Sequence, residues 1–194
     1  MEARTAEIKR KTKETDVTVR LNLDGVGKYE IDSGVGFLDH MLTHLSKHSR
    51  IDMVVKAKGD LEVDAHHTVE DIAICLGECL IKALGDKKGI ARYGYSSVPM
   101  EDALANVSID LSGRAACVYN VRYRTDKIGD FDVECIEEML RSFSNNGRFN
   151  LHINVPYGTN SHHIAEAIFK GLGKSLGAAV GIQGTDVPST KGVL

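Results

Sequence analysis

The 194-residue chain contains no apolar run of the length that spans a membrane, so we expect no transmembrane helix. Its first fifteen residues are strongly polar, and a secretory signal is not expected there either. The formal net charge is only −3, which provides no overall field that would draw the chain to nucleic acid or to acidic lipid. These features predict a compact cytoplasmic protein that binds neither nucleic acid nor membranes.

Cysteine is also scarce, with four residues and no CxxC pair. This usage is typical of the reducing cytoplasm, where thiols act as small buried hydrophobic side chains. Cys75 and Cys79 are four residues apart and have the spacing to share a metal on one helix face. A core position beside Leu76 and Leu80 is the favoured interpretation.

Two further patterns are missing. No glycine-rich fingerprint of a nucleotide-binding loop is present, which disfavours nucleotide binding. No low-complexity or proline-rich linker interrupts the chain, so residues 1–194 are expected to pack as a single domain.

What is present begins with two kinds of periodicity. Alternation of apolar and polar residues predicts strands at 17–23, 29–31, 51–57, 98–111, 116–123 and 149–155. Apolar residues at helical spacing predict helices at 36–48, 66–84, 134–143 and 162–180. Strand-rich modules with two helices each favour an α+β fold in which sheets back a central layer of helices.

The two longest predicted helices repeat one sequence. Laid over each other without a gap, residues 66–85 and 162–181 are identical at nine of twenty positions. An amphipathic helix explains the shared apolar residues, but it does not explain why both segments begin with HHxxE. Upstream, His40 aligns with Glu138. We therefore expect an internally duplicated α/β module, with repeats at about 1–92 and 93–194.

Each HHxxE motif offers two imidazoles and a carboxylate at the start of a helix. Adjacent histidines are rotated by about 100° around the helix axis, so His66 and His67 cannot easily grip one ion, and each is expected to serve a different metal or a different subunit. One such motif is equally compatible with surface histidines, but two copies in one duplicated frame favour metal binding. The candidate ligands are His40, His66, His67, Glu70, Glu138, His162, His163 and Glu166.

The types of these ligands limit the choice of metal. Imidazole and carboxylate without thiolate argue against a structural thiolate site and favour six-coordinate Mn²⁺ over tetrahedral Zn²⁺. His44 lies in the same helical stripe as His40 and His48, and we expect it on a solvated helix face.

Basic and hydroxyl side chains form a second candidate site. Lys170 lies one helical turn beyond Glu166, and the tail places hydroxyls next to a lysine. Each basic residue alone is typical of a solvated surface charge. Together they predict a phosphate cradle formed by Arg92, Arg114, Lys170, Ser189, Thr190 and Lys191.

Six segments, in order and spread over nearly the whole chain, resemble the signature segments of the imidazoleglycerol-phosphate dehydratase family. They are TKETD at 12–16, GFLDHML at 36–42, DAHHTVED at 64–71, DLSGR at 110–114, NSHHIAEA at 160–167 and PSTKG at 188–192. The resemblance implies the duplicated fold of the second domain of ribosomal protein S5, with two sheets flanking a four-helix layer. It also implies a homo-oligomer of 24 subunits whose active sites are shared between neighbours.

The same resemblance implies the reaction. Members of the family dehydrate D-erythro-imidazole glycerol phosphate to imidazole acetol phosphate in histidine biosynthesis, with two Mn²⁺ per active site that favour an imidazolate and then a diazafulvene. Carried over by position, one ion would be held by His40, His67, Glu70 and His163, and the other by His66, Glu138, His162 and Glu166. Many members have histidine where this chain has Glu138, and carboxylate is an equally reasonable Mn²⁺ ligand.

The resemblance also implies catalytic roles. Glu14 matches the family's catalytic glutamate and would handle the carbon-bound proton, although composition alone describes it as a solvated charge. His48 would contact the substrate or shuttle a proton, since imidazole titrates in the required range. Glu101 and Asp102 are weaker acid/base candidates.

Two other functions fit the residues without the resemblance. A di-metal hydrolase of phosphate esters would use the same histidines and basic residues. A metal-assembled structural protein would use the HHxxE pairs only to join subunits, and replacement of Glu14 would then change nothing.

Overall fold

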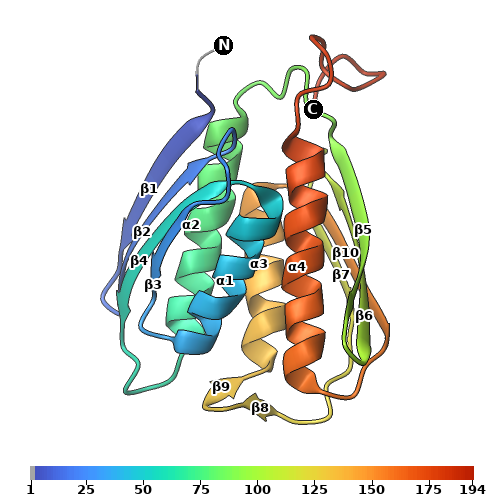
Figure 1. The fold of residues 1–194 in the computed structure, drawn as a ribbon. Helices are drawn as coiled ribbons and strands as arrows, with labels where there is room; N and C mark the ends of the chain where they lie inside the picture. Colours follow the sequence, from blue (N-terminus) through green and yellow to red (C-terminus); the bar gives the residue numbers. More distant parts are fainter. Residues whose placement is uncertain (1–2) are drawn as a thin grey trace.

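The computed structural model describes residues 3–194 and has three layers. Two four-stranded sheets form the outer layers, and four helices fill the space between them (Figure 1). This arrangement confirms the expected α+β fold with two sheets flanking a four-helix layer. Within residues 3–194, no helix combines the length and the apolar character needed to cross a membrane.

The elements follow one another in the same order twice. The first half contains β1 (Thr5–Lys11), β2 (Thr15–Asn22), β3 (Tyr29–Asp32), α1 (Gly36–Ser49), β4 (Asp52–Gly59) and α2 (His66–Leu84). The second half contains β5 (Tyr93–Met100), β6 (Ala103–Asp110), β7 (Ala116–Asn120), β8 (Lys127–Ile128), β9 (Phe131–Asp132), α3 (Glu134–Gly147), β10 (Asn150–Tyr157) and α4 (Ser161–Val180).

Strand pairing repeats as well. The sheets have the orders β1-β2-β4-β3 and β5-β6-β10-β7. In each sheet the first three strands of this order pair antiparallel with one another, and the fourth strand pairs parallel to the third. The two halves are therefore copies of one module, and only the short β8–β9 hairpin has no counterpart in the first half of residues 3–194.

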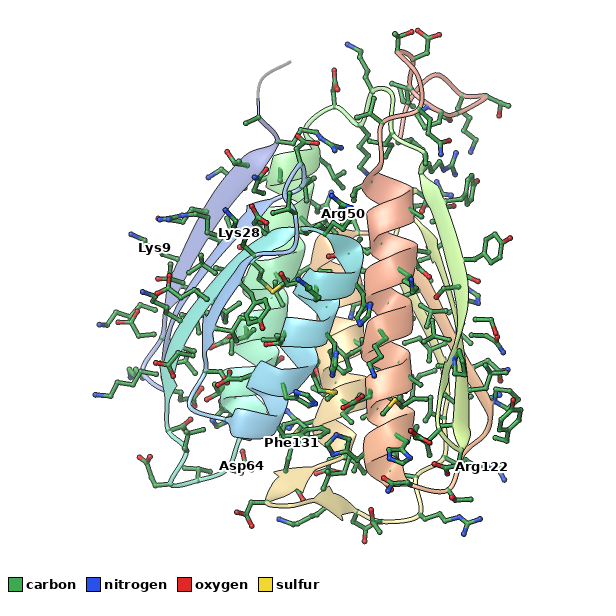
Figure 2. All side chains as sticks on the ribbon, viewed as in Figure 1. Lys9, Lys28, Arg50, Asp64, Arg122 and Phe131 are labelled. Carbon is green, nitrogen blue, oxygen red and sulfur yellow. The ribbon has the colours of Figure 1, made fainter. Side chains whose placement is uncertain are left out.

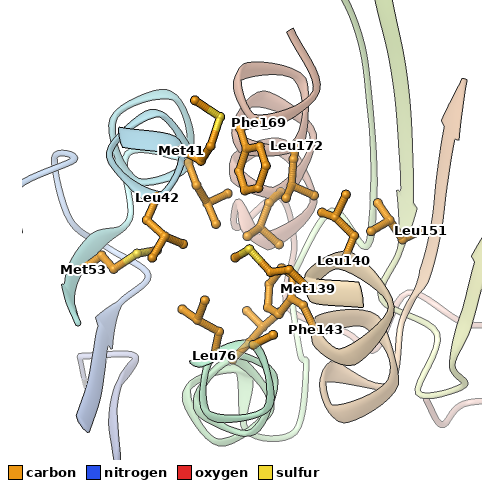
Figure 3. Packing of buried hydrophobic residues seen from close by; sticks show 14 of the residues in the cluster. Met41, Leu42, Met53, Leu76, Met139, Leu140, Phe143, Leu151, Phe169 and Leu172 are labelled. Carbon is orange, nitrogen blue, oxygen red and sulfur yellow. The ribbon is translucent and has the colours of Figure 1, made fainter. Parts of the chain in front are cut away.

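The helices pair across the two halves. α1 packs against α4, and α2 packs against α3. Glycines permit the close approach of α2 and α3, because a Cβ atom on Gly77 would lie 2.5 Å from the backbone nitrogen of Gly147. Large apolar side chains from all four helices fill the centre, as Figure 3 shows for Met41, Leu76, Met139, Phe143 and Phe169. The core consequently fixes the helix ends that carry the histidines.

Side-chain acceptors define where the two HHxxE helices begin. Asp64 Oδ1 accepts from the backbone N–H of His66 at 2.7 Å, before α2. Asn160 Oδ1 accepts from the N–H groups of His162 and His163 at 2.9 and 3.3 Å, before α4. An acidic or amide residue two positions before the first histidine thus satisfies otherwise unpaired N–H groups of the first turn.

The strand predicted at 98–111 was wrong, because this segment forms two strands. β5 and β6 are joined by a tight turn at Glu101 and Asp102, and Glu101 adopts a positive φ of 48°. Alternation continues through the turn, so the pattern alone shows no break. β1 was also missed, because it is an edge strand rich in charge, with Lys9 pointing outward (Figure 2).

Candidate active site

His40 from α1 meets His162 and Glu166 from α4 at the cross-half helix pair. Oε1 of Glu166 lies 2.8 Å from Nε2 of His40 and 3.1 Å from Nε2 of His162. One ligand atom from each of the three residues falls within 4.8 Å of the others. In the part of the chain that the structure describes, this is the one group of three such side chains close enough to surround a single metal ion.

Glu166 is the buried centre of this cluster, with a side chain only 9% exposed. Burial raises its pKa, but hydrogen bonds from Lys170, His40 and His162 outweigh burial and hold the pKa well below its usual range. Nζ of Lys170 lies 2.5 Å from Oε2 of Glu166. Lys170, expected in the phosphate cradle, therefore contacts the metal-ligand cluster in this chain.

His44 does not lie on a solvated helix face, and that expectation was wrong. Its ring is 17% exposed, and its Nε2 lies 3.3 Å from Nε2 of His40 and 3.4 Å from Glu166 Oε1. Burial lowers the pKa of His44. The helical stripe of histidines faces α4, since α1 packs against α4, and this could not be deduced from α1 alone.

The second histidine of each motif turns away from the first. The rings of His66 and His67 are nearly perpendicular at 87°, and those of His162 and His163 are at 81°. The adjacent histidines of the second motif also have different partners, because His162 bonds to Glu166 on its own helix and His163 bonds to Asp102 in the β5–β6 turn.

Each second histidine is instead paired with an aspartate through Nδ1. His67 Nδ1 lies 2.9 Å from Asp60 Oδ2, and His163 Nδ1 lies 2.6 Å from Asp102 Oδ1. An imidazole that donates from Nδ1 to a carboxylate leaves the Nε2 lone pair available to a metal. The hydrogen bond with Asp60 also raises the pKa of His67.

Asp102 is an acceptor and not an acid. The hydroxyl group of Thr159 and the Nδ1 atom of His163 donate to its carboxylate. The backbone N–H groups of Thr159 and Asn160 donate to it as well. These bonds hold the pKa of Asp102 well below its usual range. Sequence reasoning treated Asp102 as a weak acid/base candidate and missed Asp60. Asp60 lies seven residues before His67, whereas only the fold brings Asp102 to His163.

The remaining candidate ligands belong to the other helix pair. His66 and Glu70 lie in the first turns of α2, and Glu138 lies on α3, which packs against α2. Glu138 Oε1 accepts from the hydroxyl of Ser142 at 3.0 Å. The structure thus groups His40 with His162 and Glu166, whereas the division carried over by position placed it with His67, Glu70 and His163.

The two predicted catalytic residues lie on different elements, Glu14 at the β1–β2 turn and His48 near the end of α1. Glu14 is exposed in the turn between β1 and β2, and its charge contributes to the raised pKa of His67. His48 lies in the last turn of α1, stacked on His44 at 5.9 Å between ring centroids. Burial and the charges of Lys174 and Lys170 lower the pKa of His48.

Most of the residues expected to form a phosphate cradle gather at the far end of α4. A hollow of about 580 Å³ is lined by five of the six expected residues, namely Arg92, Arg114, Ser189, Thr190 and Lys191. Arg92 already pairs with Asp110 at 2.7 Å and donates to the backbone oxygen of Pro188 at 2.9 Å, so it also holds the tail. Arg114 and Lys191 are exposed in the same hollow.

The donor atoms fit a divalent cation. The cluster offers two imidazole nitrogens and a buried carboxylate oxygen, and Asp60 and Asp102 orient two further imidazoles. Imidazole and carboxylate without thiolate suit Mn²⁺, Fe²⁺ or Zn²⁺. The four cysteines are free and lie away from this cluster, with three of them buried.

Comparison with known proteins gives one consistent result. A family model described as imidazoleglycerol-phosphate dehydratase matches residues 33–176. The chain is 54% identical to the imidazoleglycerol-phosphate dehydratase of Desulforudis audaxviator over 192 residues, which cover 98% of each protein. It is 55% identical to that of Exiguobacterium sp. over 190 residues, which cover 97% of each.

Solved structures with a similar fold belong to the same family. The crystal structure of imidazoleglycerol-phosphate dehydratase from Staphylococcus aureus superposes with a TM-score of 0.84 at 36% identity, covering 92% of this chain and 99% of that chain. The structure of the enzyme from Pyrococcus furiosus gives a TM-score of 0.85 at 39% identity, covering 96% of this chain and 100% of that chain.

Proposed function

The chain belongs to the imidazoleglycerol-phosphate dehydratase family, and we propose that it dehydrates D-erythro-imidazole glycerol phosphate to imidazole acetol phosphate at sites that hold two Mn²⁺ ions each. It is a lyase of histidine biosynthesis. The observation that carries the proposal is the cluster of His40, His162 and Glu166, in which three metal-ligand atoms lie within 4.8 Å of one another.

In this proposal, each metal draws on both halves of the duplicated fold. His40, His162 and Glu166 form one set of ligands, and by the equivalence of the halves His66, Glu70 and Glu138 form the other. His67 and His163 complete the coordination with Nε2, because their Nδ1 atoms are held by Asp60 and Asp102. These two imidazoles face away from their own neighbours and would reach ions held by another subunit.

The proton to be removed lies on a carbon with no adjacent carbonyl group and is scarcely acidic. Bound Mn²⁺ supplies Lewis-acid stabilisation of the deprotonated imidazole ring of the substrate and a template that orients it. The ring N–H proton and the hydroxyl of the attached carbon would leave as water, and the diazafulvene so formed would have an acidic C–H bond at the next carbon. Loss of that proton, with return of a proton to the ring nitrogen, would give the enol, which tautomerises to the ketone. Glu14 would take the carbon-bound proton, and His48 would contact the substrate or pass a proton at its ring nitrogen.

The cradle residues would hold the phosphate and so orient the reacting carbons. The cradle reaches α4 near Ala179, since the backbone N–H of Arg92 donates to the oxygen of Ala179 at 2.9 Å. At a rise of 1.5 Å per residue, the seventeen residues from His162 to Ala179 place the cradle roughly 25 Å from the cluster. A substrate with three carbons between ring and phosphate cannot bridge that length. We therefore propose that each active site combines the cluster of one subunit with the cradle of another.

Two features support a large cytoplasmic assembly. The family resemblance implies 24 subunits, and an active site that is shared between subunits exists only in an oligomer. The free cysteines are compatible with a reducing compartment, and burial raises the pKa of Cys79 to about 11, which keeps that thiol unreactive.

The deciding experiment supplies purified protein with imidazole glycerol phosphate, with Mn²⁺ or with a chelator, and follows the acetol phosphate. Product that depends on Mn²⁺ supports the proposal. Release of inorganic phosphate without acetol product would favour a phosphate-ester hydrolase instead. Absence of both products, from folded protein shown to contain metal, would reject an enzymatic role on this substrate.

A further inference from the structure

Asp71 is a buried carboxylate that binds no substrate or metal in the proposed site. It follows Glu70 in the HHTVED segment, and its residue is only 6% exposed. Oδ1 accepts from Nε of Arg10 at 2.6 Å, and Oδ2 accepts from the hydroxyl of Thr15. Arg10 lies on β1 and Thr15 begins β2, so one side chain of α2 holds both strands of the N-terminal hairpin.

From Thr15 the hydrogen bonds continue to Glu14. Because the single hydroxyl proton of Thr15 goes to Asp71, the hydroxyl of Thr12 is the donor across the 3.2 Å contact to Thr15 Oγ1. Thr12 Oγ1 in turn accepts from the backbone N–H of Glu14 at 3.1 Å and from that of Thr15 at 2.9 Å. The hydroxyl chain, meaning Asp71, Thr15 and Thr12, therefore has one direction and ends at the main chain of Glu14.

The start of the hydroxyl chain lies near the metal ligands. Asp71 is four residues beyond His67 and so lies one turn along the same face of α2. The end of β4, where Gly59 pairs with Thr15 of the hairpin, also fits closely on the start of α2, because a Cβ atom on Gly59 would lie 1.9 Å from Oγ1 of Thr68 and 3.6 Å from Cγ2 of Thr15. The turn that carries Glu14 is thus attached to the helix that carries His67.

The second half of the chain has no carboxylate at the position equivalent to Asp71. Ala167 occupies the position equivalent to Asp71, and the equivalent β5–β6 turn binds its histidine directly through Asp102. A carboxylate needed only to stabilise the duplicated fold would be expected in both copies. Only the first copy has a buried acid at this position, and the hairpin that it holds is the one that carries Glu14.

We propose that Asp71 is a positioning residue, which acts through Thr15 and Thr12 to hold the backbone of Glu14 where its carboxylate reaches the substrate. This inference rests on the proposed function for the role of Glu14. It predicts that loss of the Thr15 hydroxyl impairs proton transfer by Glu14 and leaves metal binding and substrate affinity intact.

The test compares T15V, which keeps the shape of the side chain and removes the hydroxyl, with T15S, which keeps the hydroxyl. T15V is expected to lower kcat by about tenfold or more with KM within about twofold, while T15S retains most of the activity. Mn²⁺ content and particle size are expected to be unchanged in both. T18V is the control for the same substitution on the same strand, at a residue that is half-buried where Thr15 is buried. If T15V does not fold by circular dichroism, T12V takes its place.

A double variant separates positioning from general stability. If Thr15 acts through Glu14, T15V causes no further loss of kcat in the E14Q background. An equal loss in both backgrounds, or full activity of T15V, overturns the proposal.

Failure of the proposed function has a different signature, namely that wild-type protein forms no product or that E14Q remains fully active. Amide hydrogen exchange then decides the structural part of the inference. Unchanged exchange of the Glu14 and Thr15 amides in T15V overturns it.

Discussion

Asp102 and His163 are sixty-one residues apart in the chain, and their side chains meet at 2.6 Å between Oδ1 and Nδ1. The bond fixes both the orientation of the imidazole and the nitrogen that it presents outward. Asp60 does the same for His67 at 2.9 Å. In both halves an aspartate is paired with Nδ1 of the second histidine, but the aspartate comes from the β5–β6 turn in one half and from the loop after β4 in the other.

Replacement of Asp102 by asparagine is expected to weaken Mn²⁺ binding by about 10- to 100-fold, because the imidazole of His163 loses its charged partner. The amide oxygen can still accept from the loop N–H groups, so the fold should persist. Titration of metal into chelator-treated protein, followed by elemental analysis, measures the effect. Asp126→Asn, an exposed acid in the loop before β8, serves as the control. Equal affinity of the Asp102 variant and wild type would contradict the orienting role.

Replacement of Arg114 by alanine is expected to raise KM by about 10- to 100-fold, since a charged hydrogen bond to phosphate is lost. The change in kcat should be smaller, and metal content should not change, because the cradle lies at the far end of α4. Steady-state kinetics at fixed ionic strength provide the measurement. Lys88→Ala removes an exposed lysine that pairs only with Asp86 and should leave KM at the wild-type value. A similar rise in KM for Lys88→Ala would show that loss of any nearby positive charge raises KM, and would contradict a specific role of Arg114.

Two impaired variants, assayed at a substrate concentration well below the raised KM of Arg114→Ala, should recover activity when they assemble together. Arg114→Ala lacks part of the cradle, and Glu166→Gln lacks the buried ligand of the cluster. If each site takes cluster and cradle from different subunits, a random mixture of the two chains contains about a quarter of intact sites. Co-expression with two affinity tags, double purification and kinetic assay would measure the recovery. Activity no greater than that of the separate variants would show that each chain forms its own site.

Acid should release the metal and then loosen the assembly. In the metal-free chain the raised pKa of His67 means that the His67–Asp60 pair stabilises fully below the ordinary value of 6.5. That contribution is lost as pH rises through the raised pKa. Metal binding has the opposite dependence, because a ligating imidazole must be neutral. Mn²⁺ content and particle size are expected to fall together between about pH 8 and about pH 5. Light scattering with elemental analysis tests this, and a particle that keeps its size after demonstrated metal loss would contradict it.

Gly77→Ala is expected to lower the free energy of unfolding by at least about 1 kcal/mol, because overpacking outweighs the gain in helix propensity. The added methyl group would lie 2.5 Å from the backbone nitrogen of Gly147, and neither helix can yield without shifting the core. Gly36→Ala is the control, since a Cβ atom there meets no atom within 4 Å. Denaturant unfolding of both variants provides the comparison. Equal stability of the two variants would show that the α2–α3 contact tolerates more volume than its geometry indicates.

Periodicity predicted the helices well, because each has a continuous apolar stripe that the core requires. The helix at 66–84 was predicted with its observed bounds, and the other three were correct to within four residues at either end. Strand edges were harder to predict. Apolar alternation runs through the Glu101–Asp102 turn, and β1 has too few apolar residues to stand out, since one of its edges has no neighbouring strand.

The site was predictable in its residue types and less so in its grouping. HHxxE stands out because two copies occur in one frame. Charge and hydroxyl context placed Arg114 and Lys191 in one group, and both line the same hollow, while their binding of phosphate stays a prediction. Which ligands meet depends on how α1 packs on α4, which is a tertiary property that spacing along the chain does not contain. His44 and Asp60 escaped for the same reason, because their partners come from another element or from a loop.

α4 carries candidate metal ligands in its first turns and meets the proposed phosphate cradle at its last turn, so one rigid helix holds these two groups of residues apart. If each active site is shared between subunits, as we propose, a newly synthesised copy would carry two parts of an active site and could complete neither by itself. Dilution below the point of association would act on this protein as an inhibitor does. A defective copy, in turn, would silence sites in its neighbours as well as those it was made to serve.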